Sequence, residues 1–192
     1  LLLTLSASAQ MFDSIRESFN HKPKFYGHFN TRNAFVSNSH SQVRGIGLGV
    51  IYNKTFTMAM TYNWLNTEFT SVFNTTDTAK LKLRYVAPFI EYTFHEKNNW
   101  IVSIPIYIGF GKSLYETEDK KKFNNQFVML YEPAMKVTYR FLKYLGVSAG
   151  LGVRVMLLGN GKVNENFNSP TYTIGAKIFV GDLYKDVKKV FD

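Results

Sequence analysis

Cysteine is absent from the 192-residue chain, which excludes disulfides and thiolate metal sites. An apolar run of 18 residues is also lacking, so the sequence predicts no transmembrane helix. Charged residues are scarce at 19%, whereas aromatic residues reach 16%. The formal net charge is +9, but the cations are dispersed along the chain, which argues against a nucleic-acid-binding surface. The chain is therefore rich in aromatic residues and has no predicted transmembrane helix.

Large apolar residues recur at every second position through most of the chain. Because side chains alternate across a strand, each such run has one apolar and one polar face. The pattern is clear in one run, Phe56, Met58, Met60, Tyr62 and Trp64. The runs are about ten residues or longer, which is long for a soluble strand but suits a tilted strand that crosses a bilayer. The sequence therefore predicts strands whose apolar face contacts lipid.

Eight such runs predict an all-β fold, an eight-stranded antiparallel up-and-down transmembrane β-barrel with short helical segments before and after it. The expected strands are Lys24–Ser37, Val43–Asn53, Thr55–Asn66, Lys80–Phe94, Trp100–Tyr115, Gln126–Phe141, Leu145–Leu158 and Thr171–Val180. Tight connections (Asn53–Thr55, His95–Asn99, Leu142–Tyr144) alternate with mostly longer ones (Asn38–Gln42, Thr67–Ala79, Glu116–Asn125, Gly159–Pro170). This alternation is typical of bacterial outer-membrane barrels and predicts that both termini lie in the periplasm.

Two local expectations follow from strand register. Pairing across the Leu142–Tyr144 turn sets Glu132 opposite Arg154 on the polar face, where opposite charges stabilise a ladder. In the run Lys80–Phe94 the apolar positions change parity, which predicts a β-bulge near Tyr85–Val86.

The segments outside the barrel divide the chain into residues 1–9, a signal-peptide remnant; 10–23, a periplasmic segment; 24–180, the barrel; and 181–192, a periplasmic tail. The apolar start and the small residues Ala7-Ser8-Ala9 indicate a cleavage site, although a short N-terminal strand or helix is the alternative. Residues 11–20 have helical spacing. The tail also has helical spacing and predicts a partner-binding, mouth-covering or lipid-surface helix, with a frayed terminus as the alternative. Its apolar residues are Leu183, Val187, Val190 and Phe191.

The polar faces indicate which side of the barrel is enclosed. A soluble, lipocalin-like barrel would point its apolar face inward and carry Lys and Glu outside, whereas these polar faces carry many glycines, which suit a crowded interior. The predicted lumen ion network is Arg32, Lys82, Arg84, Glu91, Glu132, Lys136, Arg140, Arg154 and Lys177. Aromatics near the strand ends predict two interfacial girdles, formed by Tyr52, Phe56, Trp64, Trp100, Phe110, Phe127, Tyr139, Phe141 and Tyr172.

The alternation, strand number and loop pattern resemble the small outer-membrane β-barrel proteins of the OmpX/OmpA transmembrane-domain type, in a Bacteroidetes-like style. The resemblance covers Lys24 to Val180; the chain departs from the pattern by continuing to Asp192. Some barrels of this size modify lipid A through a His/Ser/Glu site in later strands. This chain has no histidine there; its histidines are His21, His28, His40 and His95.

The sequence therefore predicts no catalytic, cofactor or metal site. The expected function is structural or interactive, as an accessory subunit of an outer-membrane complex or a surface-binding protein. The expected partners are outer-membrane lipid or lipopolysaccharide and other outer-membrane or periplasmic proteins. Seven cations against two carboxylates in the predicted lumen leave two interpretations, filling by paired groups or a narrow anion-preferring channel. A lipid A-modifying enzyme is the second alternative.

Overall fold

The computed structural model describes residues 11–36, 39–67, 70–72, 78–117, 122–159 and 168–191. The predicted signal remnant at residues 1–9 lies outside them. The strands are β1 (Lys24–Val36), β2 (Ser39–Tyr52), β3 (Phe56–Leu65), β4 (Thr70–Val72), β5 (Thr78–Lys97), β6 (Trp100–Thr117), β7 (Lys122–Leu142), β8 (Leu145–Leu158) and β9 (Ser169–Ile178). A helix at residues 11–18 precedes them, and α2 (Val180–Phe191) follows. Neither described helix is long and apolar enough to cross a membrane.

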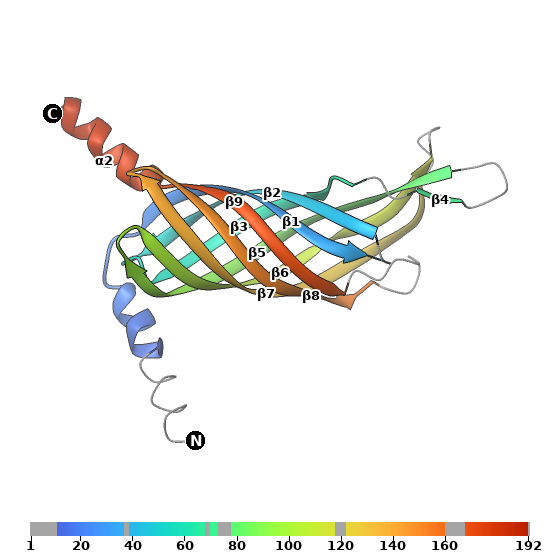
Figure 1. Cartoon of the computed structure of the whole chain (residues 1–192), viewed down its shortest axis with the longest axis horizontal. Coiled ribbons are helices and arrows are strands. Elements are labelled where there is room, and N and C mark those ends of the chain that lie inside the picture. Colours follow the sequence, from blue (N-terminus) through green and yellow to red (C-terminus); the bar gives the residue numbers. More distant parts are fainter. Residues whose placement is uncertain are drawn as a thin grey trace, which may run out of the picture.

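Antiparallel pairing closes the sheet into a ring. Sequence neighbours pair around the wall, β1 pairs with β9, and β3 pairs with β5. The short β4 adds only to the edge of β5, so the ring has eight strands and the predicted fold class is confirmed. One end of the barrel carries tight turns and the two helices, and we call it the turn end (Figure 1). The opposite end, from which β5, β6 and β7 extend, is the loop end (Figure 1).

Asparagine makes two of the turns at the turn end possible. Asn53 and Lys54 both have positive φ, as do Asn98 and Asn99. Asn98 and Asn99 join the register partners Lys97 and Trp100, so they form a two-residue hairpin turn whose twist matches that of the flanking strands. The β2–β3 connection has one residue more, because Tyr52 pairs with Phe56. Asparagine adopts a positive φ more easily than most residues. These turns fix the registers of β2 with β3 and of β5 with β6.

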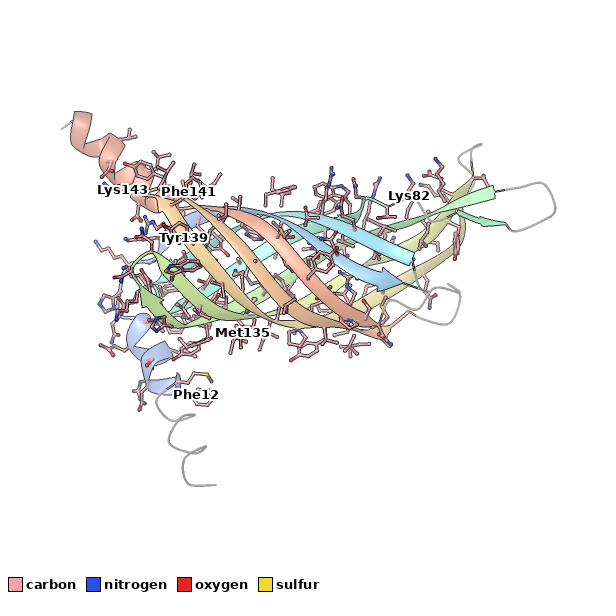
Figure 2. The ribbon with its side chains drawn as sticks, in the orientation of Figure 1. Phe12, Lys82, Met135, Tyr139, Phe141 and Lys143 are labelled. Carbon is pink, nitrogen blue, oxygen red and sulfur yellow. The ribbon has the colours of Figure 1, made fainter. Side chains whose placement is uncertain are left out.

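The apolar face of the wall points outward. Met58, Ile104 and Val153 are 45%, 39% and 48% exposed, whereas an apolar-inward barrel would bury them. Met135 and Tyr139 also project from the wall (Figure 2). On the inner face, glycine makes room for larger groups: a Cβ on Gly47 would lie 2.4 Å from the His28 ring. The arrangement is the reverse of a soluble, lipocalin-like barrel.

The predicted bulge near Tyr85–Val86 is wrong. The register of β5 is continuous there on both sides, and the irregularity lies between Thr93 and His95. Leu81, Leu83 and Tyr85 do not face outward but belong to an apolar cluster inside the loop end. The wall therefore keeps its alternation, and it is the polarity of its two faces that reverses along β5.

The predicted loops at the loop end are shorter in the structure. The connection expected over Thr67–Ala79 contains β4 and the start of β5. The loop expected over Glu116–Asn125 is strand up to Thr117 and again from Lys122, with residues 118–121 outside the described set. β2 likewise begins at Ser39, within the connection expected over Asn38–Gln42. The polar composition of these segments predicted loops, but strand pairing continues beyond the apolar part of the wall toward the loop end.

The helix at residues 11–18 lies against the outside of the turn end. Phe19, just after it, packs on Tyr52 and Phe56, with ring centroids 4.9 and 5.4 Å apart. This contact buries Phe56, although its side chain belongs to the outward face of β3. Phe12 remains 66% exposed (Figure 2). The segment thus presents an aromatic side chain beside the barrel wall.

Candidate functional site: the charged lumen and its mouth

A network of one carboxylate and two arginines spans the middle of the lumen. Glu132 on β7 accepts a hydrogen bond from Arg32 Nη1 on β1 at 2.8 Å. It also accepts one from Arg154 Nε on β8, its predicted cross-strand partner. Arg32 lies over the Tyr107 ring, 4.1 Å from its centroid, and Tyr85 Oη accepts a hydrogen bond from Arg32. The three charged side chains are at most 4% exposed, so each charge depends on the others for compensation.

A second carboxylate pairs with two lysines nearer the turn end. Glu91 on β5 is fully buried and bonds Lys136 Nζ at 2.5 Å, while Lys177 Nζ lies 3.6 Å away. Ser103 donates a further hydrogen bond to Glu91. Lys177 also lies over the Tyr26 ring. Strands β5, β6, β7 and β9 each supply one group, so the wall of the barrel assembles the cluster.

Two predicted members of the lumen network do not enter it. Lys82 and Arg84 lie on the outward face of β5, because Leu81, Leu83 and Tyr85 occupy the inward positions between and beside them. The prediction for these two residues is wrong, and the reversal of polarity described above is the reason. The remaining predicted cations all have a carboxylate partner: four share Glu132 and Glu91, and Arg140 bonds Asp182.

Three of the four histidines have described side chains, and they lie in different parts of the barrel. His28 is in the lumen between Tyr26 and Phe89, and neither ring nitrogen has a hydrogen-bond partner among the described residues. His21 lines the mouth of the barrel, and His95 is exposed near the turn end of β5, where it pairs with Val102. The described ranges also contain no group of three residues that could hold a metal ion.

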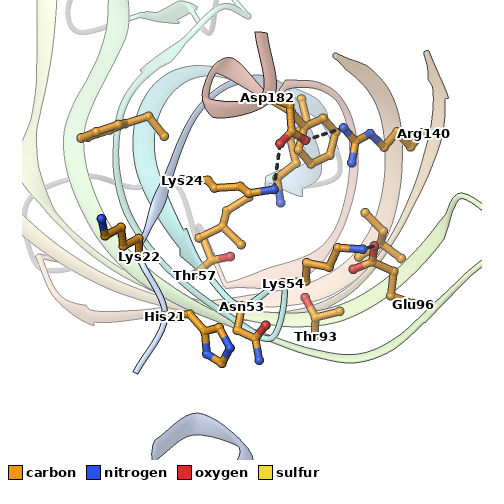
Figure 3. Close-up of a pocket in the computed structure, with 15 residues that line it drawn as sticks. His21, Lys22, Lys24, Asn53, Lys54, Thr57, Thr93, Glu96, Arg140 and Asp182 are labelled. Carbon is orange, nitrogen blue, oxygen red and sulfur yellow. Dashed lines mark hydrogen bonds and ion pairs between the residues drawn. The ribbon is translucent and has the colours of Figure 1, made fainter. Parts of the chain in front are cut away.

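The mouth at the turn end holds a cavity of about 330 Å³ (Figure 3). Lys24, Arg140 and Lys177 reach it from the wall, and Asp182 reaches it from α2. Asp182 bridges Lys24 at 2.8 Å and Arg140 at 2.6 Å, as the dashed lines in Figure 3 show. The sequence identified Arg140 as a lumen residue but gave no signal for its partner, because Asp182 lies 42 residues away in the tail.

Ion pairs at two successive turns attach α2 to the barrel. Asp182 is the first attachment, and Asp186, which contacts Lys143 and Tyr144, is the second. Partial burial tends to raise the pKa of Asp182, but hydrogen bonds from Lys24 and Arg140 outweigh it and hold the pKa below the ordinary 3.8. A carboxylate with a depressed pKa contributes stability above its ordinary pKa, and the contribution is lost as pH falls through the depressed value.

We expect Asp182→Asn to loosen α2. Its hydrogen bonds are partly exposed, so the loss is about 1 kcal/mol, or about a fivefold lower protection of the α2 amides against hydrogen exchange. Exchange followed by mass spectrometry measures this directly. Asp13→Asn, on the other helix, serves as the control. The wild-type protein should approach the variant below about pH 4, corrected for intrinsic exchange, and equal protection at pH 7 would show that Asp182 does not hold the helix.

The predicted interfacial aromatics divide between the two ends of the wall. Tyr52, Phe56, Trp100, Tyr139 and Phe141 lie toward the turn end, and Trp100 packs on Tyr139 at 4.8 Å. The others lie toward the loop end, namely Trp64, Phe110, Phe127 and Tyr172. All except Phe56, Trp64 and Tyr52 are at least 37% exposed. In the tail, Leu183 and Val187 are exposed, whereas the side chains of Val190 and Phe191 lie outside the described set.

A closed ring of eight antiparallel strands, apolar outside and charged within, defines the class as a small outer-membrane-type β-barrel. No protein-family model and no curated protein sequence matches the chain. Several solved structures are similar to the chain. Neisserial surface protein A superposes with a TM-score of 0.65 at 13% identity, over 83% of this chain and 99% of that one. The N-terminal β-barrel domain of Pseudomonas aeruginosa OprF gives 0.54 at 9%, over 82% and 98%.

Ail, the attachment invasion locus protein of Yersinia pestis, solved with the heparin analogue sucrose octasulfate, gives 0.51 at 8% identity, over 81% of this chain and 96% of that one. At these identities the likeness establishes the fold. The OmpX/OmpA-like architecture expected from the sequence is thereby supported, while the Bacteroidetes origin stays a prediction.

Proposed function

We propose that the protein is a non-conducting barrel of the bacterial outer membrane that serves as a structural or accessory interaction protein. The termini and α2 then lie in the periplasm. The observation that carries the proposal is the filled lumen. Glu132 with its two arginines and Glu91 with its two lysines span the interior at successive levels. The hollow described between Tyr26, Tyr107 and Lys136 is about 20 Å³, the size of a single water site.

The interior between the charged side chains and the loop end also supports a non-conducting barrel. Leu83, Tyr85, Val128 and Leu130 are fully buried inside the loop end, where they pack as an apolar cluster. An ion passing through the lumen would have to displace both the apolar cluster and the paired charges. A small barrel whose side chains fill its interior is suited to present its ends rather than to conduct.

The end most suited to a protein partner is α2. Leu183, Tyr184 and Val187 are 41%, 67% and 47% exposed on a helix that two ion-pair sites attach to the barrel. A helix with exposed apolar residues on a rigid base can dock in a partner's groove. The partner we propose is a periplasmic or outer-membrane protein.

Two measurements on the same purified barrel test the proposal. In planar bilayers it should show no unitary conductance, whereas reproducible anion-selective steps would support the channel alternative. In mild detergent a defined complex should co-purify at a fixed stoichiometry, and Leu183→Gln/Val187→Gln should reduce its yield at least tenfold. Phe12→Gln, an exposed change on the other helix, is the control. Loss of the complex in both variants, or in neither, would contradict the role given to α2.

A further inference from the structure

Outward-facing side chains change from apolar to cationic between two adjacent rows of the wall near the loop end. The lower row consists of the register partners Tyr62, Val86 and Phe110, all exposed. Two residues further toward the loop end, Arg84 pairs with Trp64 on one side and Lys112 on the other. Because cations are disfavoured against acyl chains, this change locates the level where the wall passes from hydrocarbon into headgroups.

The cationic row places like charges side by side. Arg84 and Lys112 are direct cross-strand partners, and both are exposed. Like charges at such a pair destabilise a ladder. No carboxylate of the described residues lies within ion-pair range of Arg84 or Lys112. Glu116 lies on the same part of the wall, but its partner is Lys82, at 3.9 Å. An anion held between Arg84 and Lys112 would remove the repulsion.

A hollow in the outer wall joins the two rows. It measures about 350 Å³. Its cations are Lys82, Arg84, Lys112 and Lys122, and its apolar side is formed by Tyr62, Val86 and Phe110. Lys82 projects beside it at the loop end (Figure 2). The hollow thus combines positive charge toward the loop end with an apolar surface toward the middle of the wall, which matches an amphiphile bearing an anionic head.

We propose that this hollow binds a phosphorylated lipid of the outer leaflet. The phosphate lies between Arg84 and Lys112, and an acyl chain follows the row of Tyr62, Val86 and Phe110. Arginine suits this role because its guanidinium bonds phosphate through two N–H groups at once. Trp64, next to Arg84 in the register, packs at the headgroup level. The site rests on the outer-membrane placement proposed above, with the loop end facing outward.

The test uses the full chain in zwitterionic detergent with Trp100→Phe, which leaves Trp64 as the sole tryptophan and reporter. Bisphosphorylated lipid A is titrated and compared with its dephosphorylated form. We expect at least tenfold tighter binding of the phosphorylated lipid. Arg84→Gln/Lys112→Gln should weaken that binding by about 25-fold, since one cation near an anionic surface contributes about fivefold. Arg84→Lys, which keeps the charge and the fold, should retain part of the preference.

The matched control removes two cations at the turn end, Lys54→Gln/Lys97→Gln, and should bind within about twofold of the parent protein. Equal affinity for the dephosphorylated lipid, or an unchanged preference in the Arg84/Lys112 variant, would overturn the proposal. Displacement of the lipid by millimolar inorganic phosphate would also overturn it, because it would assign the site to a free anion. Conductance and co-purification are separate readouts, so failure of the proposed function is distinguishable from failure of this site.

Discussion

Glu132→Gln should lower the free energy of unfolding of the barrel by about 3–5 kcal/mol. The substitution preserves shape but removes the carboxylate that compensates Arg32 and Arg154, both of which are at most 3% exposed. Two buried guanidinium groups would then face each other with only neutral acceptors nearby. Urea titration in lipid vesicles, followed by tryptophan fluorescence and by the mobility shift of folded barrels on gels, measures the change.

Glu96→Gln provides the matched control for this prediction. Glu96 also pairs with a cation, Lys54 at 2.8 Å, but the lysine side chain is 64% exposed. Water screens such a pair, so its loss should lower the free energy of unfolding by less than about 1 kcal/mol. If Glu132→Gln has an effect equally small, the central charges are hydrated, and the lumen is not the filled interior on which the proposed function depends.

Leu48→Arg should lower the free energy of unfolding by about 2–4 kcal/mol, the cost of a cation at the bilayer midplane. Leu48 is 73% exposed on β2 and lies midway between Tyr52 at the turn end and Arg44 toward the loop end. Its outward neighbour across the ladder is Met60. An arginine here must either enter hydrocarbon or bend a long way to reach headgroups. The same titration in vesicles measures the effect.

A second arginine variant separates depth from charge. Leu142→Arg adds the same group at the turn end, where Leu142 is 55% exposed, and should cost about 0–1 kcal/mol. Should the two variants be equally stable, and Leu48→Arg stay soluble without detergent, the apolar wall would be in water and the membrane placement would fail.

The sequence predicted best where one physical rule governs a whole strand. Alternation located all eight ring strands, and register across a single turn paired Glu132 with Arg154 correctly. The rule failed in β5 because it assumed one solvent along the entire wall. Between Val86 and the loop end, the outer face of β5 no longer contacts lipid tails. Cations therefore face outward in this part of β5, and Leu83 and Tyr85 face inward. The change of parity of the apolar positions in β5 therefore indicates a change in what surrounds the wall, not a β-bulge.

The contacts of the mouth could not be predicted for a different reason. Asp182 and Lys24 are 158 residues apart, and nothing in their local sequences marks them as partners. They meet because β1 and β9 are neighbours in the closed ring, which brings the segments flanking both strands to one rim. Helical spacing indicated a tail helix, and only the three-dimensional closure shows which side chains attach it.

The pairing of β1 with β9 also constrains how the protein is made. The strand synthesised first is hydrogen-bonded to the strand synthesised last, from Gly27 opposite Ile178 to Ala34 opposite Thr171. An open edge is not tolerated in hydrocarbon, because its amide and carbonyl groups would have no partners there. Unassisted insertion strand by strand would leave such an edge in hydrocarbon, so the ring is complete only when β9 is available to pair with β1.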